Sequence, residues 1–277
     1  MKKILFCFLI VLIIALVVYL IFIKDKSTEE PLSVNLQITE YDNPVALTKA
    51  IEELEKRGIK TATVFVGKQF TEDNCSLVRE LDQKGYEIAA VGYAFDDNGE
   101  FIQLANMVKE DQEKIIKDTK DVIEGCIGHK IGGFRAQRFS QNKDTNEIVN
   151  DAGFSWHGSF VINWHPEASY IPYYSSDYGF YVVSIEGVGK SGYVLCDTAM
   201  ASYNKTAKEW KDTIQDYFYQ HQKDGIPFIT EFHPYFLVDK SDWWDEFINI
   251  LDWLGKQNIN YLTVQQFIDS SCPVCGE

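Results

Sequence analysis

The chain has 277 residues, of which 45% are hydrophobic and 14% aromatic. This composition is sufficient for a packed core and excludes a disordered protein. The 41 acidic and 26 basic residues give a formal net charge of -15, which would repel nucleic-acid phosphates and anionic lipid surfaces. We therefore expect no nucleic acid as a partner.

The chain opens with an uncharged apolar run at residues 4–23, which has lysines on both sides. A helix of this length spans a bilayer core of roughly 30 Å. No A-x-A-like cleavage site comes after the run, so the pattern favours an uncleaved anchor over a cleaved signal peptide. We expect a single-pass membrane anchor at residues 1–25, a linker at 26–31 and an outward-facing domain, because single N-terminal anchors commonly export the domain behind them.

The domain is expected to begin at residue 32 with alternating strands and helices. Residues 32–39 alternate apolar and polar side chains as a strand does, and Asn43-Pro44 is a helix start. Further segments are a helix ending at Gly58, a strand at 61–67, a helix ending at Gly85 and a strand at 86–91. This alternation, at intervals of about 25 residues, predicts parallel strands joined by crossover helices.

The same pattern continues to the end of the domain at residue 270. The expected elements are a surface helix within 99–125, a strand at 131–135, a short helix around Ile148, strands through Phe160 and at 180–185, a helix at 206–224, a strand at 227–232, a helix at 241–256 capped by Ser241, and a strand at 259–262. Periodicity thus predicts one α/β domain and leaves open whether its sheet is a barrel or an open parallel sheet.

The six cysteines do not settle the compartment. Cys7 lies in the apolar run, and the remaining five are an odd number for a disulfide framework. The CPVC sequence in the tail at 271–277 lacks a second ligand pair for zinc, so a local disulfide or a free pair is favoured. A redox protein acting through Cys272 and Cys275 stays open as a further class, and deleting the tail would test it.

Several motifs resemble the polysaccharide deacetylase (NodB-homology) family in order and spacing. They are GIKTATVFVG at 58–67, GYEIAAVGYAF at 85–95, the run at 112–142, DAGF at 151–154 and FITEFHPYF at 228–236. The resemblance implies a distorted (β/α)7 barrel with its site at the carboxyl ends of the strands. It also implies metal-assisted removal of an acetyl group from an N-acetylated sugar.

The usual metal-binding motif is substituted in this chain. Where the family has GHEIxxHGYSH, with two histidines that bind a divalent metal, this sequence has Val91 and Phe95. Neither side chain has a lone pair to donate to a metal. We therefore expect no cofactor, and zinc only if the site is rearranged. One such rearrangement would combine Asp42 and His233 with His157 or His165.

The resemblance also assigns the first catalytic motif, usually TFDD, to residues 39–42. Asp42 keeps the position of the metal ligand, and Tyr41 occupies the position of the catalytic base. Glu40 alternates with Asp42 along the strand and could share a face with it as a shifted base.

At two further catalytic positions of the family, this chain has the same residue type. Arg135 matches the arginine that orients the base, and His233 matches the late histidine that protonates the leaving amine. By resemblance, the candidate catalytic residues are Glu40, Asp42, Arg135 and His233.

Aromatic residues near the predicted strand ends and loops could stack on sugar rings. The candidate substrate-binding residues are Tyr93, Trp156 and Trp164. One hypothesis is a degenerate family member that binds an envelope glycan or N-acetylated polysaccharide in the former cleft. The alternative is an active carbohydrate deacetylase, acting on carbon-nitrogen bonds other than peptide bonds, with a rearranged site. Three metal-capable side chains around a common point would favour the alternative.

Overall fold

The computed structural model describes residues 30–95, 99, 101–189 and 192–271. Within the chain, Leu32–Glu277 forms a compact unit by itself. The predicted anchor at 4–23 and the CPVC tail lie outside the described residues. Among the helices that are described, none combines the length and apolar character needed to cross a bilayer.

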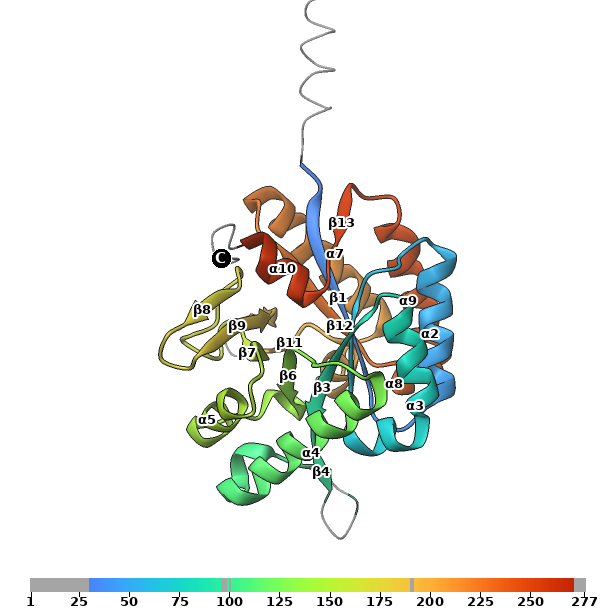
Figure 1. Ribbon diagram of the computed structural model, residues 1–277. Helices are drawn as coiled ribbons and strands as arrows, with labels where there is room; N and C mark the ends of the chain where they lie inside the picture. The colour runs from blue at the N-terminus through green and yellow to red at the C-terminus, as the bar shows by residue number, and fades with distance from the viewer. Residues whose placement is uncertain (1–29, 96–98, 100, 190–191, 272–277) are drawn as a thin grey trace, which may run out of the picture. The chain divides into compact units, whose positions relative to one another are not determined.

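A curved sheet of nine strands forms the centre of the domain (Figure 1). Its strands are β1 Leu32–Glu40, β2 Thr63–Val66, β3 Glu87–Gly92, β6 Gly133–Ala136, β7 Trp156–Val161, β8 Tyr173–Ser175, β9 Phe180–Ile185, β12 Phe228–Phe232 and β13 Ile259–Tyr261. The order is β12-β1-β2-β3-β6-β7-β9-β8, with β13 also beside β1. All neighbouring pairs are parallel except β8 with β9. The predicted parallel α/β arrangement is confirmed.

The predicted distorted (β/α)7 barrel takes the form of a curled half-barrel. Within the described residues, no ladder of strand pairs joins β9 to β12. Cys196, which comes after β9 in the chain, instead makes one isolated parallel bridge with Glu231 of β12. The segment around Cys196 and the strand β12 therefore lie side by side at the gap between β9 and β12.

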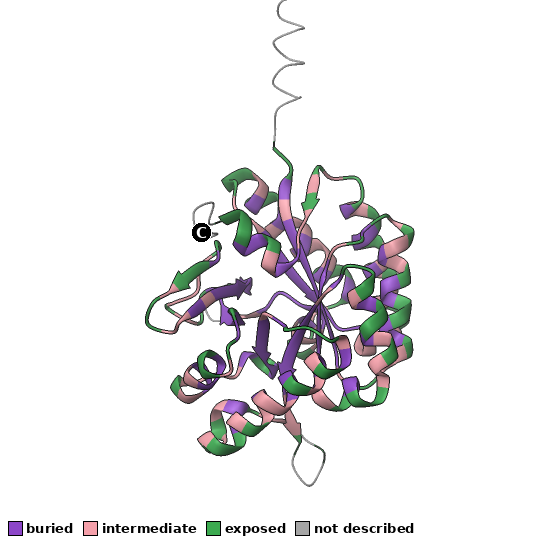
Figure 2. Ribbon diagram, in the orientation of Figure 1, coloured by how far each residue is buried: buried purple, intermediate pink, exposed green. Residues whose placement is uncertain are grey.

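Most of the helices cover the outer side of this sheet, and Figure 2 shows purple, buried strands beside helices whose outer faces are green and exposed. The helices are α2 Pro44–Lys56, α3 Lys68–Gln83, α4 Lys109–Ile127, α5 Lys143–Asp151, α6 Asp197–Ser202, α7 Ala207–Asp224, α8 Pro234–Val238, α9 Ser241–Leu254 and α10 Val264–Ser271. Two small hairpins pair β4 Ala94–Phe95 with β5 Phe101–Ile102, and β10 Gly187–Val188 with β11 Tyr193–Val194. Short 3-10 turns lie at Leu104–Asn106 and Gln137–Phe139.

A side-chain cap explains where helix α2 begins, and helix α9, which has no such cap, is stabilised by packing. The Asn43 side chain accepts a hydrogen bond from the Ala46 N–H at 3.0 Å, and Pro44 is the first helical residue of α2. The predicted Ser241 cap is wrong, because Lys240 is the cap residue and makes no side-chain cap bond. Burial of Trp243 and Phe247 against the core stabilises α9 in place of a cap.

Strand alternation separates two cores. Leu36 and Ile38 of β1 belong to the large core beneath the outer helices, whereas Gln37 and Thr39 point to the opposite face of the sheet. That inner face holds a second apolar cluster, which includes Phe65 of β2 and residues of α10. Polar side chains at the carboxyl end of the inner face therefore lie above an apolar floor.

A disulfide joins the outer helices α3 and α4 through Cys75 and Cys126, which are 51 residues apart. The number of cysteines did not predict this pairing, because nothing in the local sequence places these two helices side by side. Among the described cysteines, Cys196 is left as a buried free thiol.

Candidate functional site

A cavity of about 500 Å³ opens at the carboxyl ends of the parallel strands. Strands that run in one direction end at one edge, so the residues directly after them gather there. The lining residues come mainly from the segments after β1, β6, β7 and β12 and from α6. They are Tyr41, Phe101, Arg135, Gln137, Arg138, Phe139, Trp164, Tyr193, Val194, Cys196, Thr198, Ala199, Ser202, Tyr203, Glu231, His233 and Tyr235.

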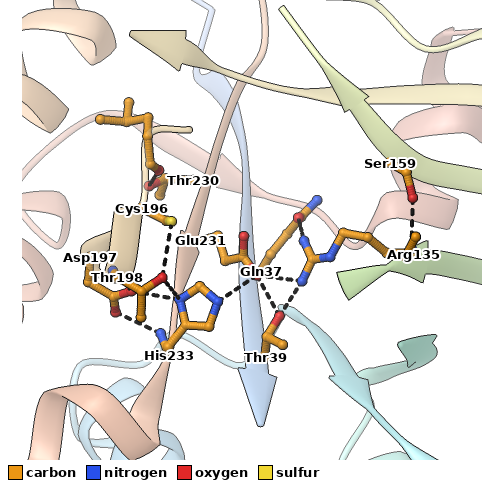
Figure 3. A network of polar contacts seen from close by, with 12 residues as sticks. Gln37, Thr39, Arg135, Ser159, Cys196, Asp197, Thr198, Thr230, Glu231 and His233 are labelled. Carbon is orange, nitrogen blue, oxygen red and sulfur yellow. Dashed lines mark hydrogen bonds and ion pairs between the residues drawn. The ribbon is translucent and has the colours of Figure 1, made fainter. Parts of the chain in front are cut away.

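Buried polar side chains meet at the base of this cavity (Figure 3). The Arg135 guanidinium donates to Gln37 Oε1 at 2.7 Å and to Glu231 Oε1 at 2.5 Å, and it also bonds the Thr39 hydroxyl. The Thr39 hydroxyl donates to Glu231 Oε1 at 2.6 Å. The guanidinium carbon lies 3.7 Å from the centre of the Phe65 ring, a cation–π contact in a desolvated place. Arg135 is therefore held by Glu231 of β12 and stacked on β2.

His233 lies between two carboxylates. Its Nδ1 is 2.6 Å from Asp197 Oδ1, and its Nε2 is 3.2 Å from Glu231 Oε1. Asp197 also accepts the backbone N–H of His233 at 2.7 Å and that of Thr198 at 2.6 Å. The imidazole thus has a fixed orientation, because both of its nitrogens have an anionic partner.

The protonation states of His233 and its two carboxylate partners depend on one another. Burial by itself would lower the pKa of His233, but Glu231 and Asp197 outweigh burial and raise it to about 10. Burial would likewise raise the pKa of Glu231, but Arg135 and His233 lower it to about 2. Burial raises the pKa of Asp197 against the opposing effect of His233. The imidazole is therefore expected to be charged at neutral pH when only these side chains surround it.

An aromatic cluster occupies the region between β1 and β3 at this edge. It consists of Tyr41, Tyr93, Phe95, Phe101 and Tyr235. The Tyr41 ring centre lies 5.2 Å from Tyr93, 5.4 Å from Phe101 and 5.6 Å from Tyr235. The Phe95 ring centre lies 4.6 Å from that of Phe101. These edge and tilted contacts are those that aromatic pairs prefer, so the cluster is well packed.

The family's usual metal does not fit the residues present here. Val91 is fully buried in the inner apolar cluster, and Phe95 belongs to the aromatic cluster. Tyr41 is also part of that cluster, and burial raises the pKa of its phenol well above the ordinary value. Asp42 is exposed, and a single carboxylate beside apolar groups is not a site for a divalent ion.

The two acidic residues predicted for catalysis lie outside the cavity lining. Glu40 is buried, and its Oε1 accepts the backbone N–H groups of Tyr41, Asp42 and Asn43 at 2.9, 3.3 and 3.1 Å. Its Oε2 accepts the Tyr235 N–H at 2.9 Å. Glu40 therefore binds the end of β1 to the start of α8, while Asp42 faces solvent. Of the four predicted catalytic residues, the structure brings only Arg135 and His233 to the cavity.

The three predicted substrate-binding aromatics lie in different places. Trp164 lines the cavity and is 42% exposed. Tyr93 lines a smaller cavity of about 340 Å³ beside α3 and α4. Trp156 is completely buried, and its Nε1 donates to Glu87 at 3.2 Å. We do not retain Trp156 as a sugar-binding residue, because it begins β7 at the opposite end of the strands and presents no surface to a ligand.

The rearranged metal set of Asp42 and His233 with His157 or His165 is also not assembled. His157 is buried with its Nε2 2.7 Å from the Ser159 hydroxyl, and His165 Nδ1 accepts the Val161 N–H at 3.0 Å. Burial lowers the pKa of His157 to about 3, so it is a neutral core residue.

Sequence reasoning missed two members of the polar group, Cys196 and Asp197. Together with His233 they are the one cluster of three potential metal ligands found among the described residues. The sequence signal was a carboxylate shortly after the apolar run Val194-Leu195, the position of a strand end. The run is short, and the helix α6 behind it has only six residues, so no periodicity marked it.

A curled α/β half-barrel with a polar cavity at the carboxyl ends of its strands defines the class of this protein. A family model described as polysaccharide deacetylase matches residues 38–157. Residues 38–157 are therefore similar in sequence to this family, and Val91 and Phe95 stand within them where the usual metal-binding motif has histidines. No curated protein gives a significant match.

Solved structures show the same fold at low sequence identity. A proposed polysaccharide deacetylase from Mycobacterium smegmatis superposes with a TM-score of 0.67 at 14% identity, over 89% of this chain and 93% of that one. The peptidoglycan deacetylase PdaC from Bacillus subtilis gives 0.57 at 14% identity, over 87% and 91%. A CE4 family pseudoenzyme from Bacillus anthracis gives 0.56 at 13% identity, over 87% and 67%. The similar structures thus include both a deacetylase and a pseudoenzyme.

Proposed function

We propose that this protein is a degenerate polysaccharide-deacetylase-like protein that binds a glycan in its cavity without the usual Asp-His-His metal centre. The observation that carries this proposal is a contrast within one site. The positions of the two metal-binding histidines are filled by Val91 in the core and Phe95 in the aromatic cluster. The cavity beside them nevertheless remains open.

The chemistry of the cavity suits a sugar. Its volume of about 500 Å³ lies in the range typical of small-molecule sites. Trp164, Tyr203 and Tyr235 provide flat faces, and Arg138 provides hydrogen-bond donors. Glu231 Oε2 is buried with no hydrogen-bond partner among the described residues, so a ligand hydroxyl or amide N–H would satisfy it.

The proposed glycan class rests on the family. The similar structures include a protein described as a peptidoglycan deacetylase, and another with the same fold is described as a pseudoenzyme. We therefore assign an N-acetylated envelope glycan as the ligand.

We further propose that the domain is anchored in a membrane by residues 4–23 and faces the outside of the cell. The apolar run supports anchoring. The Cys75–Cys126 disulfide supports an oxidising compartment, because disulfides are rare in the reducing cytosol.

The proposal is tested with the full-length chain, purified in detergent, and a soluble N-acetylglucosamine oligomer, with calorimetry as the measurement. We expect saturable binding and no acetate release. Substituting Trp164→Ala should weaken binding about tenfold, since loss of one stacked aromatic costs on the order of 1.4 kcal/mol. The matched control is Tyr174→Ala, because Tyr174 is 55% exposed and is not a lining residue of the cavity.

Two outcomes would count against the proposal. Absence of binding to N-acetylglucosamine oligomers and to intact peptidoglycan would overturn it. Acetate release that disappears in His233→Gln would favour the active deacetylase instead, since His233 and its partner Asp197 lie at the cavity.

A further inference from the structure

Three side chains with different donor atoms meet at the base of the cavity. Cys196, Asp197 and His233 each offer one ligand atom, and these atoms all lie within 4.8 Å of one another. All three residues are buried. Cys196 and His233 also line the cavity, so the group is reached from the open side of the site.

The orientation of His233 suits a metal ligand. Its Nε2 faces Glu231 at 3.2 Å, and Glu231 is itself held by Arg135 and Thr39. A carboxylate that accepts the N–H of one ring nitrogen fixes the tautomer and leaves the other nitrogen to bind a metal. That other nitrogen, Nδ1, faces Asp197 at 2.6 Å and the Thr198 hydroxyl at 3.4 Å.

We propose that Cys196 Sγ, His233 Nδ1 and Asp197 Oδ1 bind a divalent cation of the zinc class at the base of the cavity. This site differs from the family's usual centre in residues and in position, because it lies between α6 and the end of β12. It extends beyond the proposed glycan binding and does not depend on it.

The donor set determines the class of cation. One sulfur, one nitrogen and one oxygen are the ligands that zinc takes in proteins, whereas magnesium and calcium take oxygen. Tetrahedral bonds of about 2.0 to 2.3 Å hold neighbouring donors roughly 3 to 4 Å apart. The Thr198 hydroxyl, 3.6 Å from Cys196 Sγ, or a water in the cavity would fill the fourth position.

Binding of the cation exchanges protons for metal. The Cys196 thiol gives up its proton to solvent, and so does the hydrogen-bonded Nδ1–H of His233. The His233 Nδ1 and Asp197 Oδ1 atoms then separate by about 1 Å so that both can bind at normal metal distances. Asp197 keeps its bonds from the backbone N–H groups of Thr198 and His233, which hold the carboxylate in place.

The experiment uses cobalt as a spectroscopic substitute, because a thiolate bound to Co²⁺ gives a charge-transfer absorption band. The starting protein is the full-length chain with Cys7→Ser, Cys272→Ser and Cys275→Ser, purified in detergent and stripped with a chelator. With Cys75 and Cys126 in a disulfide, Cys196 is then the one free thiol in the chain. We expect a band that saturates at about one cobalt per chain and disappears when zinc is added.

Two variants of that protein test the ligands. Cys196→Ser and His233→Gln should each lose the band and lower zinc affinity at least tenfold, with an unchanged circular dichroism spectrum. His165→Gln is the control and should keep both, because His165 bonds the Val161 backbone outside the cluster. Absence of a band in the starting protein, or about one tightly held zinc per chain in folded Cys196→Ser, would overturn the proposal.

Discussion

At the scale of single residues, Glu40 shows how a shifted pKa can suggest a role that geometry does not support. Burial raises the pKa of its carboxyl from 4.5 to about 7, against the backbone N–H groups of Asn43, Tyr41 and Asp42. Such a value is typical of a general base. Both oxygens, however, accept backbone N–H bonds, so no oxygen points to a ligand. Glu40 is a structural acceptor whose ionisation bears on stability.

The first prediction concerns Glu40→Gln. A carboxyl with a pKa raised by folding binds its proton more tightly in the native state, so its stabilising contribution is complete below about pH 4.5. That contribution is lost as the pH rises through about 7. Urea unfolding should show that, between about pH 4.5 and about pH 8, the free energy of unfolding falls by about 3 kcal/mol more for the wild type than for Glu40→Gln.

A matched control separates Glu40 from other acidic groups. Glu52 is exposed on α2, and Glu52→Gln should show the same pH dependence as the wild type. If the free energy of unfolding changes with pH in the same way for Glu40→Gln and the wild type, ionisation of Glu40 does not affect stability.

At the scale of elements, the disulfide between α3 and α4 holds together two helices that cover neighbouring strands. Cys126 is buried at the interface, and Arg79 of α3 donates to the Cys126 carbonyl at 2.8 Å. The contact between the helices therefore combines a covalent bond with a charged hydrogen bond. The covalent bond acts mainly by restricting the unfolded chain.

The second prediction concerns Cys75→Ala with Cys126→Ala. For a separation of 51 residues, the chain-entropy relation gives a loss of about 4 kcal/mol in the free energy of unfolding. Denaturant unfolding measures this loss, and a reductant should lower the stability of the wild type by a similar amount. The double variant is the control for the reductant and should not respond to it. A full response of the double variant would mean that another disulfide accounts for the effect.

Also at the scale of elements, the short helix α6 decides the composition of the site. Asp197 is its first residue and Cys196 its cap. Both reach His233 only because Cys196 bridges to Glu231 across the gap between β9 and β12. A six-residue helix leaves no periodic pattern, so its place in the fold is decided by this long-range pairing.

At the scale of the whole molecule, the acidic composition, the apolar run and the disulfide fit one arrangement. A net charge of -15 keeps the domain from binding anionic lipid surfaces directly. The apolar run at 4–23 would attach it instead, and an oxidising compartment would preserve the disulfide.

The third prediction concerns topology in cells. Protease added to intact cells that carry the full-length chain should digest the domain from 32 to 270 and leave a cytosolic marker protein uncut. Deleting residues 1–25 should leave the domain inside the cell, protected from protease and with reduced Cys75 and Cys126. A full-length domain that resists protease until the cells are lysed would contradict an outward orientation.

The parallel α/β pattern and the absence of the usual metal ligands follow from the amino-acid sequence alone. The spacing of apolar residues located β1 at Leu32 and the helices between the strands, because periodicity of 2 or 3.6 residues is a local property. The lack of a lone pair on Val91 and Phe95 is likewise a property of residue type. Neither conclusion needs knowledge of which segments meet.

Which residues form the site, in contrast, depends on how distant segments of the chain pack together. In the folded protein Trp156 is buried and Trp164 lies at the cavity, and the Glu40 carboxylate accepts backbone hydrogen bonds. The same packing also brings Cys196 and Asp197 to His233, 36 residues beyond Asp197. These outcomes depend on strand register and on the curvature of the sheet, which are set by packing between segments far apart in the chain.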